Sequence, residues 1–211
     1  MKTKILIAAA ATLLFTLPAS SQLNKYSSMK NESKTEFTGK TRIYAGMSVS
    51  YTSVDKQPAG YLGAKAGLVL NDNFSIGIAG SALWYDYRLT GLVDEGTYHL
   101  ESGYTGLFVE FTQNLGERVS INLSLLTGQG IAIYRMDRAY TESLSWYNEK
   151  IDEDTFGVME PGIELLFRTN DKFSIGLSAS YCSTSPLQLT GSSHGMLDGF
   201  RTGISFRYSI F

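Results

Sequence analysis

The chain has 211 residues and a formal net charge of −2, with 21 glycines, 13 tyrosines, 11 phenylalanines and 4 prolines. It has no basic excess to attract nucleic acid, and a single cysteine, Cys182, excludes an internal disulfide framework. The abundance of glycine and aromatic residues fits neither a disordered chain nor a helical bundle, and the length suits one all-β barrel.

The segment 1–21 has the order of a secretory signal peptide. Lys2 and Lys4 precede an apolar run over 5–17, and small residues lead to an expected cleavage after Ser21. The run is shorter than the roughly 18–20 apolar residues that a membrane-spanning helix needs. Cleavage would remove two lysines and no acids, which takes the formal charge from −2 to −4. We therefore expect an exported protein.

Residues 22–40 are polar and have no periodicity, so we expect a flexible mature N-terminus. From residue 41 onward, apolar and polar residues alternate, which is the period of a β-strand. The alternation recurs in eight segments, and we predict a barrel over 41–211. The predicted strands are 41–52, 60–70, 73–87, 103–113, 118–134, 156–168, 173–182 and 199–210.

The connections between the predicted strands differ in length. Those at 71–73, 114–117 and 169–172 are tight, whereas those after the third, fifth and seventh strands are long and polar, the longest running from Met136 to Asp154. The first connection on the long side, "SVDKQPA", is modest. Short turns at one end and longer loops at the other are typical of outer-membrane barrels. The pattern therefore predicts an all-β fold, an eight-stranded antiparallel up-and-down transmembrane β-barrel.

Alternation alone is also compatible with a soluble, periplasmic, lipocalin-like barrel, whose apolar residues would line a ligand cavity. A membrane barrel has its apolar residues outside and its polar residues within. The polar positions here are mostly Gly, Ser and Ala, which suit a narrow lumen better than a hydrated surface. The charged residues expected to face that lumen are Lys65, Glu110, Glu160, Glu164, Arg201 and Arg207.

An unpaired charge in a narrow lumen is costly, so we expect Lys65 and Arg207 to pair with Glu110 and Glu164. Such a network is either a gate of a narrow porin or a structural plug. An eight-stranded barrel is just wide enough for its side chains, which favours the plug.

Aromatic residues on the apolar positions predict two girdles at the membrane interfaces. Those near the tight turns are Phe74, Phe111, Phe167, Phe173 and Tyr208. Those toward the long loops are Tyr51, Trp84, Tyr134 and Tyr181.

Two stretches resemble the outer-membrane β-barrel domain family of small porin-like exported proteins. They are "GVMEPGIELLFRTNDKFSIGLSASY" (157–181) and "LDGFRTGISFRYSIF" (197–211). The resemblance implies a barrel in the outer membrane of a Gram-negative bacterium, in contact with its lipid, and brings no catalytic residue with it. Pro161 cannot donate to a strand ladder, so we predict a bulge or a strand start at 160–162. "TGQG" (127–130) is interpreted as a second bulge.

The last predicted strand leads directly into an aromatic residue, Phe211. It resembles the insertion signal that the barrel-assembly machinery recognises, with Tyr208 and Phe211 as its candidate residues. Phe211 lies one position out of step with that signal, because the lipid-facing positions run from Ile204 to Ile210.

The long loop over 135–155 mixes cations with aromatic side chains, a composition suited to a protein or glycan partner. Its candidate binding residues are Arg135, Arg138, Tyr140, Trp146 and Tyr147.

Catalytic signals are weak. His99 and His194 lie in or beside long loops, and "SSHG" (192–195) places Ser beside His, as in some outer-membrane lipid hydrolases, yet a triad needs a held base and an orienting acid. No spacing fits a zinc site, and the acids of 148–155 lack the spacing of a calcium loop. We expect no enzyme, metal or cofactor, but a structural or surface-interaction barrel. The alternatives are a narrow porin, a lipid-modifying enzyme and the lipocalin-like barrel.

Overall fold

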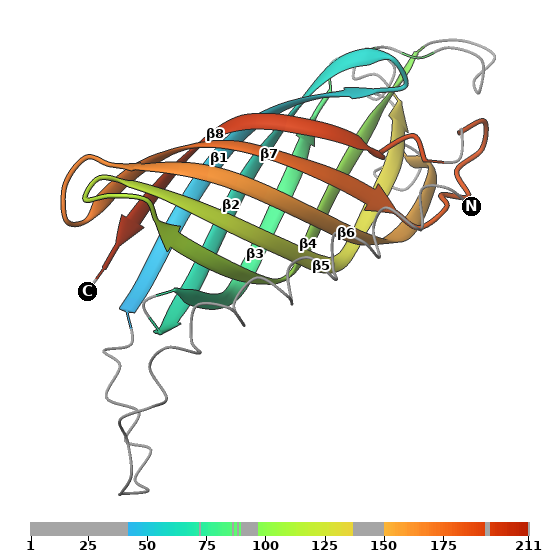
Figure 1. The fold of residues 1–211 in the computed structure, drawn as a ribbon. Coiled ribbons are helices and arrows are strands. Elements are labelled where there is room, and N and C mark those ends of the chain that lie inside the picture. Colours follow the sequence, from blue (N-terminus) through green and yellow to red (C-terminus); the bar gives the residue numbers. More distant parts are fainter. Residues whose placement is uncertain are drawn as a thin grey trace, which may run out of the picture. The chain divides into compact units, whose positions relative to one another are not determined.

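The computed structural model describes residues 42–71, 73–85, 87, 89, 97–136, 150–192 and 195–210. These residues form eight strands, and each strand pairs with its neighbours in the sequence in antiparallel order. Pairing of the last strand with the first, as at Ala45 opposite Tyr208, closes the barrel (Figure 1). The strands are β1 (Arg42–Val54), β2 (Gln57–Asn71), β3 (Phe74–Trp84), β4 (Tyr98–Asn114), β5 (Val119–Met136), β6 (Lys150–Arg168), β7 (Phe173–Thr184) and β8 (Gly199–Ser209).

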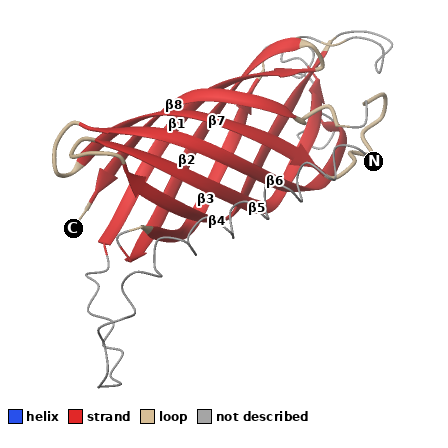
Figure 2. Cartoon of the chain, in the orientation of Figure 1, coloured by secondary structure: helices blue, strands red, loops and turns tan. Residues whose placement is uncertain are grey.

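The predicted fold class is confirmed, and strands make up the barrel wall throughout (Figure 2). Within the described part of the chain there is no helix long and apolar enough to cross a membrane. The predicted signal peptide and the segment 22–40 lie outside the described residues.

The two ends of the barrel differ. The turn end carries the β2–β3, β4–β5 and β6–β7 connections together with the start of β1 and the end of β8 (Figure 1). The loop end carries the other four connections. Three of these are long, but β1 and β2 are joined by only two residues, Asp55 and Lys56, with φ of 48° and 64°. Positive φ at both positions is the geometry of a tight type I′ hairpin, so this connection is shorter than the predicted one.

Several strands are longer than predicted at the loop end. β2 begins at Gln57, β4 at Tyr98 and β6 at Lys150, whereas β3 ends early, at Trp84. The predicted loop over 135–155 is therefore shorter, because both of its ends belong to strands. At the start of β4 the alternation is inverted, because the inward Tyr98 and Leu100 are buried while the outward Glu101 is polar and exposed.

The outer face of the barrel is apolar. Large hydrophobic side chains such as Met47, Ile78 and Leu107 are exposed around the whole wall. Trp84 and Tyr51 lie outward near the loop end, and Phe200 joins them there, 77% exposed and packed edge-on against Tyr181. A soluble lipocalin-like barrel would need a polar exterior, so this face argues against that alternative.

The placement of Tyr134 in the outer girdle is wrong. Its side chain is only 3% exposed and lies inside the barrel, edge-on against Tyr98 at a ring-centroid distance of 5.1 Å. The outward positions of β5 carry odd numbers, from Val119 to Ile133, so Tyr134 has the parity of the lumen.

The predicted bulge or strand start at Pro161 is also wrong. β6 continues through this residue, and its register with β7 is the same on both sides, with Met159 opposite Ser183 and Gly162 opposite Ser180. Only the two pairs in between are missing from that ladder. The barrel therefore accommodates the missing N–H of Pro161 by a local loss of pairing, without an inserted residue.

The glycines of "TGQG" do not mark a bulge, because 127–130 pair in unbroken register with β4 and β6. Gly106 and Gly128 face each other on adjacent strands and on the inner side of the wall. A Cβ atom on Gly106 would lie 2.8 Å from the Cα atom of Gly128. The two glycines thus let the backbones approach closely where a narrow barrel bends sharply.

Candidate functional site

The turn-side half of the lumen contains a cluster of four charged side chains from four strands, which we call the turn-side cluster. Lys65 Nζ lies 2.8 Å from Glu110 Oε1 and 3.3 Å from Glu164 Oε2. Arg207 Nη2 lies 3.0 Å and 3.1 Å from the Oε2 atoms of the same two glutamates. Each cation contacts both anions. Two cations and two anions make the cluster electrically neutral.

Neutral side chains add hydrogen bonds to this cluster, although the buried Arg207 Nε has no hydrogen-bond partner among the described residues. The Tyr44 hydroxyl donates to Glu110 Oε2 at 2.5 Å, and the guanidinium of Arg207 lies over the Tyr44 ring. Asn122 Nδ2 and Ser205 Oγ donate to Glu164. Buried carboxylates that accept several hydrogen bonds retain their charge inside the protein.

Glycine makes room for the long charged side chains. A Cβ atom on Gly176 would lie 2.7 Å from Glu164 Oε1, and one on Gly46 would lie 3.3 Å from Cγ of Lys65. The inward glycines are therefore part of the site, because a larger residue there would displace an ion-paired side chain.

A second group of polar side chains, the middle cluster, lies nearer the loop end. Arg201 Nη1 lies 3.2 Å from Glu160 Oε2, and Glu160 accepts hydrogen bonds from the hydroxyls of Tyr104 at 2.5 Å and Ser180 at 2.6 Å. The Arg201 guanidinium lies over the Tyr61 ring, 3.8 Å from its centroid. One cation and one anion make this cluster neutral as well.

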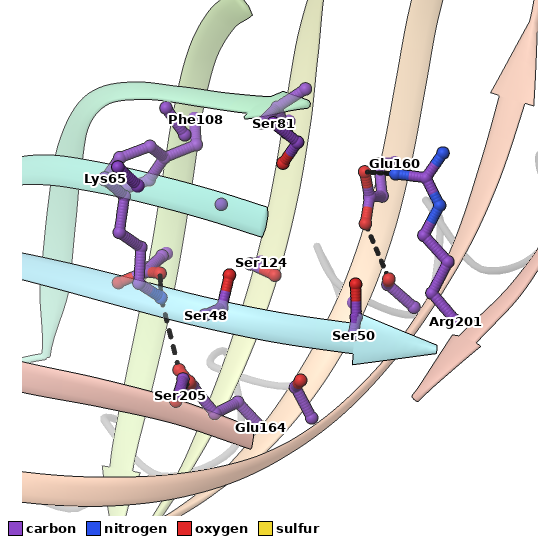
Figure 3. A pocket seen from close by; sticks show the side chains of 18 of the residues that line it. Ser48, Ser50, Lys65, Ser81, Phe108, Ser124, Glu160, Glu164, Arg201 and Ser205 are labelled. Carbon is purple, nitrogen blue, oxygen red and sulfur yellow. Dashed lines mark hydrogen bonds and ion pairs between the residues drawn. The ribbon is translucent and has the colours of Figure 1, made fainter. Parts of the chain in front are cut away.

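A cavity of about 130 Å³ separates the two clusters. Figure 3 shows Lys65 and Glu164 at one side of it and Glu160 and Arg201 at the other. The wall between them carries serine hydroxyls and glycines. This polar space is large enough for several water molecules. The serines that line it are Ser48, Ser50, Ser81, Ser124, Ser178, Ser180 and Ser205.

The loop-side half of the lumen is apolar. The segment between β7 and β8 folds inward, so that Leu187, Leu189 and Leu197 are nearly fully buried and pack in one hydrophobic cluster with Leu100 and Phe156. We call the described part of this segment, 185–192 and 195–198, the inner loop. Sequence reasoning missed it, although the alternating leucines of "SPLQLT" are a strand-like signal within a predicted polar loop.

Hydrogen bonds to carboxylates hold the inner loop in place. Asp152 Oδ2 accepts hydrogen bonds from the N–H and hydroxyl of Thr190, each at 2.8 Å. Asp154 Oδ2 accepts one from the N–H of Gln188 at 2.6 Å. At the other end, Asp198 Oδ1 accepts two from Thr184. Asp152 and Asp154 of the acidic stretch 148–155 therefore have a structural role at the loop end.

Comparison with known proteins supports the architecture. No protein-family model and no curated protein matches the chain. Among solved structures, Neisserial surface protein A aligns over 80% of this chain and 96% of its own, with 9% identity and a TM-score of 0.55. The N-terminal β-barrel domain of OprF from Pseudomonas aeruginosa covers 80% and 97%, with 11% identity and a TM-score of 0.49. Ail of Yersinia pestis covers 80% and 95%, with 13% identity and a TM-score of 0.45.

At 9% identity, the first of these likenesses concerns the fold alone. It agrees with the closed antiparallel barrel and the apolar exterior described above. The protein has the fold of a small outer-membrane β-barrel.

The candidate partner loop of this outer-membrane barrel is only partly described. Arg135 lies on β5, and its Nε atom is 3.1 Å from Glu101 Oε2 on β4. The other four residues, Arg138, Tyr140, Trp146 and Tyr147, lie outside the described residues.

The candidate assembly signal is divided in the same way. Tyr208 faces outward near the turn end and is 48% exposed, while Phe211 lies outside the described residues.

Of the two histidines, His99 Nε2 lies 3.2 Å from Glu101 Oε1, and His194 is not described. Ser192 of the "SSHG" stretch donates a hydrogen bond from its hydroxyl to the Leu189 carbonyl. In the described part of the chain no three His, Cys, Asp or Glu side chains gather as metal ligands would.

Proposed function

We propose that the protein is a small β-barrel of the Gram-negative outer membrane with a plugged lumen, a structural or surface-interaction role and no catalytic activity. The observation that carries the proposal is that both halves of the lumen are obstructed. Ion-paired side chains fill the turn-side half, and the inner loop fills the loop-side half.

Passage of a solute would require separation of these groups. Glu110 and Glu164 are 2% and 5% exposed, and removing one partner of such a buried ion pair costs about 3–5 kcal/mol. The solute would then have to displace the buried leucines of the inner loop, which also lose their packing. A resting barrel of this kind is closed.

The test has two steps. The purified protein is first run on an SDS gel with and without boiling, and a heat-dependent shift in mobility is expected of a closed membrane barrel. Its conductance in planar lipid bilayers is then measured, and we expect no steady conductance. Absence of the shift would contradict the membrane barrel itself.

The serine-lined cavity favours a narrow porin as the second candidate. This candidate predicts reproducible conductance steps in the wild type that change in Glu110→Gln, Glu164→Gln or Lys65→Met. Such a result would show that the charged cluster is a gate and not a plug. Glu117→Gln is the matched control, because Glu117 lies exposed in the β4–β5 turn.

We assign contact with a partner to the loop over 135–155. Its sequence mixes aromatic and cationic residues, a composition suited to a protein or glycan partner. The combined Trp146→Ala and Tyr147→Ala variant is expected to lose binding of the refolded barrel to an immobilised glycan panel while retaining the heat-dependent shift. Equal binding by the variant would remove this loop from the proposal.

We also propose that β8 is read by the barrel-assembly machinery. Tyr208→Ala should then lower insertion in cells but leave spontaneous refolding in detergent unchanged. Tyr51→Ala is the matched control, since Tyr51 is also an outward tyrosine but lies near the loop end of β1. Loss of both insertion and refolding would instead indicate a packing role for Tyr208.

A further inference from the structure

A second cavity, of about 250 Å³, lies at the loop end of the barrel. Three tyrosines line it: Tyr85 follows β3, Tyr98 begins β4 and Tyr134 is near the end of β5. Leu100 and Met196 add apolar surface. We call this space the tyrosine pocket. None of its lining residues belongs to the two charged clusters.

The tyrosines are held in place by packing. Each is at most 7% exposed, and the Tyr98 and Tyr134 rings meet edge to face. The Tyr134 hydroxyl points to the Met196 sulfur at 3.8 Å. Such rings offer electron-rich faces that attract cations, and their hydroxyls add hydrogen-bonding groups.

One acid gives the tyrosine pocket its charge. Asp55, in the two-residue β1–β2 turn, is the only Asp, Glu, Lys or Arg among the described residues that line it. Burial, reinforced by the nearby Asp55 carboxylate, raises the pKa of the Tyr85 hydroxyl. Tyr85 is therefore neutral at physiological pH, and Asp55 supplies the negative charge among the described residues that line the tyrosine pocket.

We propose that the tyrosine pocket binds a small organic ammonium cation from the external medium, with the ammonium group at Asp55 and the apolar part among the tyrosines and Leu100. The size agrees, because the cavity exceeds the 150 Å³ that accommodates benzene in an engineered apolar site and is smaller than a drug-sized pocket. This inference goes beyond the plugged barrel, since it does not depend on whether the lumen conducts.

Phenethylammonium, a compact aromatic cation, is the probe. The full-length barrel, refolded in detergent with its methionine methyl groups labelled with ¹³C, is titrated with the probe and followed by NMR. The Met196 signal is expected to shift, because this side chain lines the tyrosine pocket. Met47 and Met159, which are exposed on the outer wall, are internal controls and should not follow the same saturation curve.

Asp55→Asn tests the role of the charge. Asn is one of the residues that tolerate positive φ, so the tight turn is retained. We expect affinity for phenethylammonium to fall about three- to tenfold, as for a solvent-accessible charged hydrogen bond. Asp171→Asn removes the same charge from the β6–β7 turn at the opposite end and should leave affinity unchanged.

The neutral analogue 2-phenylethanol separates charge from shape and needs no variant. Wild-type protein should bind it about three- to tenfold more weakly than phenethylammonium. Equal binding of the two probes, or no saturable Met196 shift with millimolar phenethylammonium in a protein that keeps its heat-dependent mobility shift, would overturn the proposal. So would unchanged affinity in a folded Asp55→Asn protein.

Discussion

The two halves of the lumen are filled by opposite chemistry inside one closed sheet. In the turn-side half, long charged side chains of the strands meet across the barrel, as Lys65 and Arg207 do with Glu110 and Glu164. In the loop-side half, a connecting segment folds back and contributes leucines. The difference follows from the connections. Tight turns cannot reach into the barrel, so the strands must fill their end with their own side chains.

The two halves of the lumen should also contribute to the free energy of unfolding in different ways. A neutral ion cluster is stable only while every charge has its partner, whereas an apolar plug loses stability in proportion to the volume removed. Variants of the two halves should therefore respond differently, and the following experiments test that difference by urea-induced unfolding of the barrel in lipid vesicles.

The largest effect is expected from Arg207→Met. It leaves Lys65 as the one remaining cation of the turn-side cluster for Glu110 and Glu164, and we expect a loss of about 3–5 kcal/mol in the free energy of unfolding. The double variant Arg207→Met, Glu110→Gln removes one charge of each sign and should lose less than the single variant. Arg118→Met, in the exposed β4–β5 turn, is the control. A double variant that is worse than the single one would contradict charge compensation.

Leu189→Ala is expected to cost about 2–4 kcal/mol in the same unfolding experiment, because Leu189 is 4% exposed within the apolar half. Leu115→Ala changes the same residue type in an exposed turn and should have little effect. If both variants unfold like the wild type, the inner loop does not pack in the lumen, and the contrast between the halves disappears.

The middle cluster should respond more weakly than the turn-side cluster, because Glu160 is 15% exposed and lines the polar cavity together with Arg201, where water can hydrate the remaining charge. Glu160→Gln removes the charge that Arg201 faces but keeps the ability to accept hydrogen bonds from Tyr104 and Ser180, and we expect a loss of about 1.5–3 kcal/mol. Glu117→Gln is the exposed control. A loss as large as that of Arg207→Met would show that the cavity does not compensate the charge left on Arg201.

The smallest effect is local. Asp152→Asn weakens the hydrogen bonds to Thr190, and we expect a cost of about 0.5–1.5 kcal/mol. Amide hydrogen exchange should become faster at Thr190 than at Gln188, and Asp154→Asn should reverse that preference. Identical exchange in both variants would show that other contacts hold the inner loop.

Much of the wall could be predicted from the sequence. The alternation in segments such as 199–210 identified both the strands and their outward faces. Successive side chains on a strand point to opposite sides, and this does not depend on which strand lies next to it. The same parity assigned six charged residues, from Lys65 to Arg207, to the lumen side. Tyr134 shows the limit of this reasoning, because a large aromatic near the rim was assigned to the girdle against the parity of its own strand.

The sequence by itself determined the local alternation. With it came the class of barrel and the polar character of its interior. Only the tertiary structure decided which charges meet, because Glu110 and Arg207 are 97 residues apart and become neighbours through closure and register. It likewise decided that Pro161 interrupts one ladder without a bulge, and that the inner loop enters the lumen. Alternation is a property of each strand alone, whereas pairing and plugging depend on how the whole sheet closes.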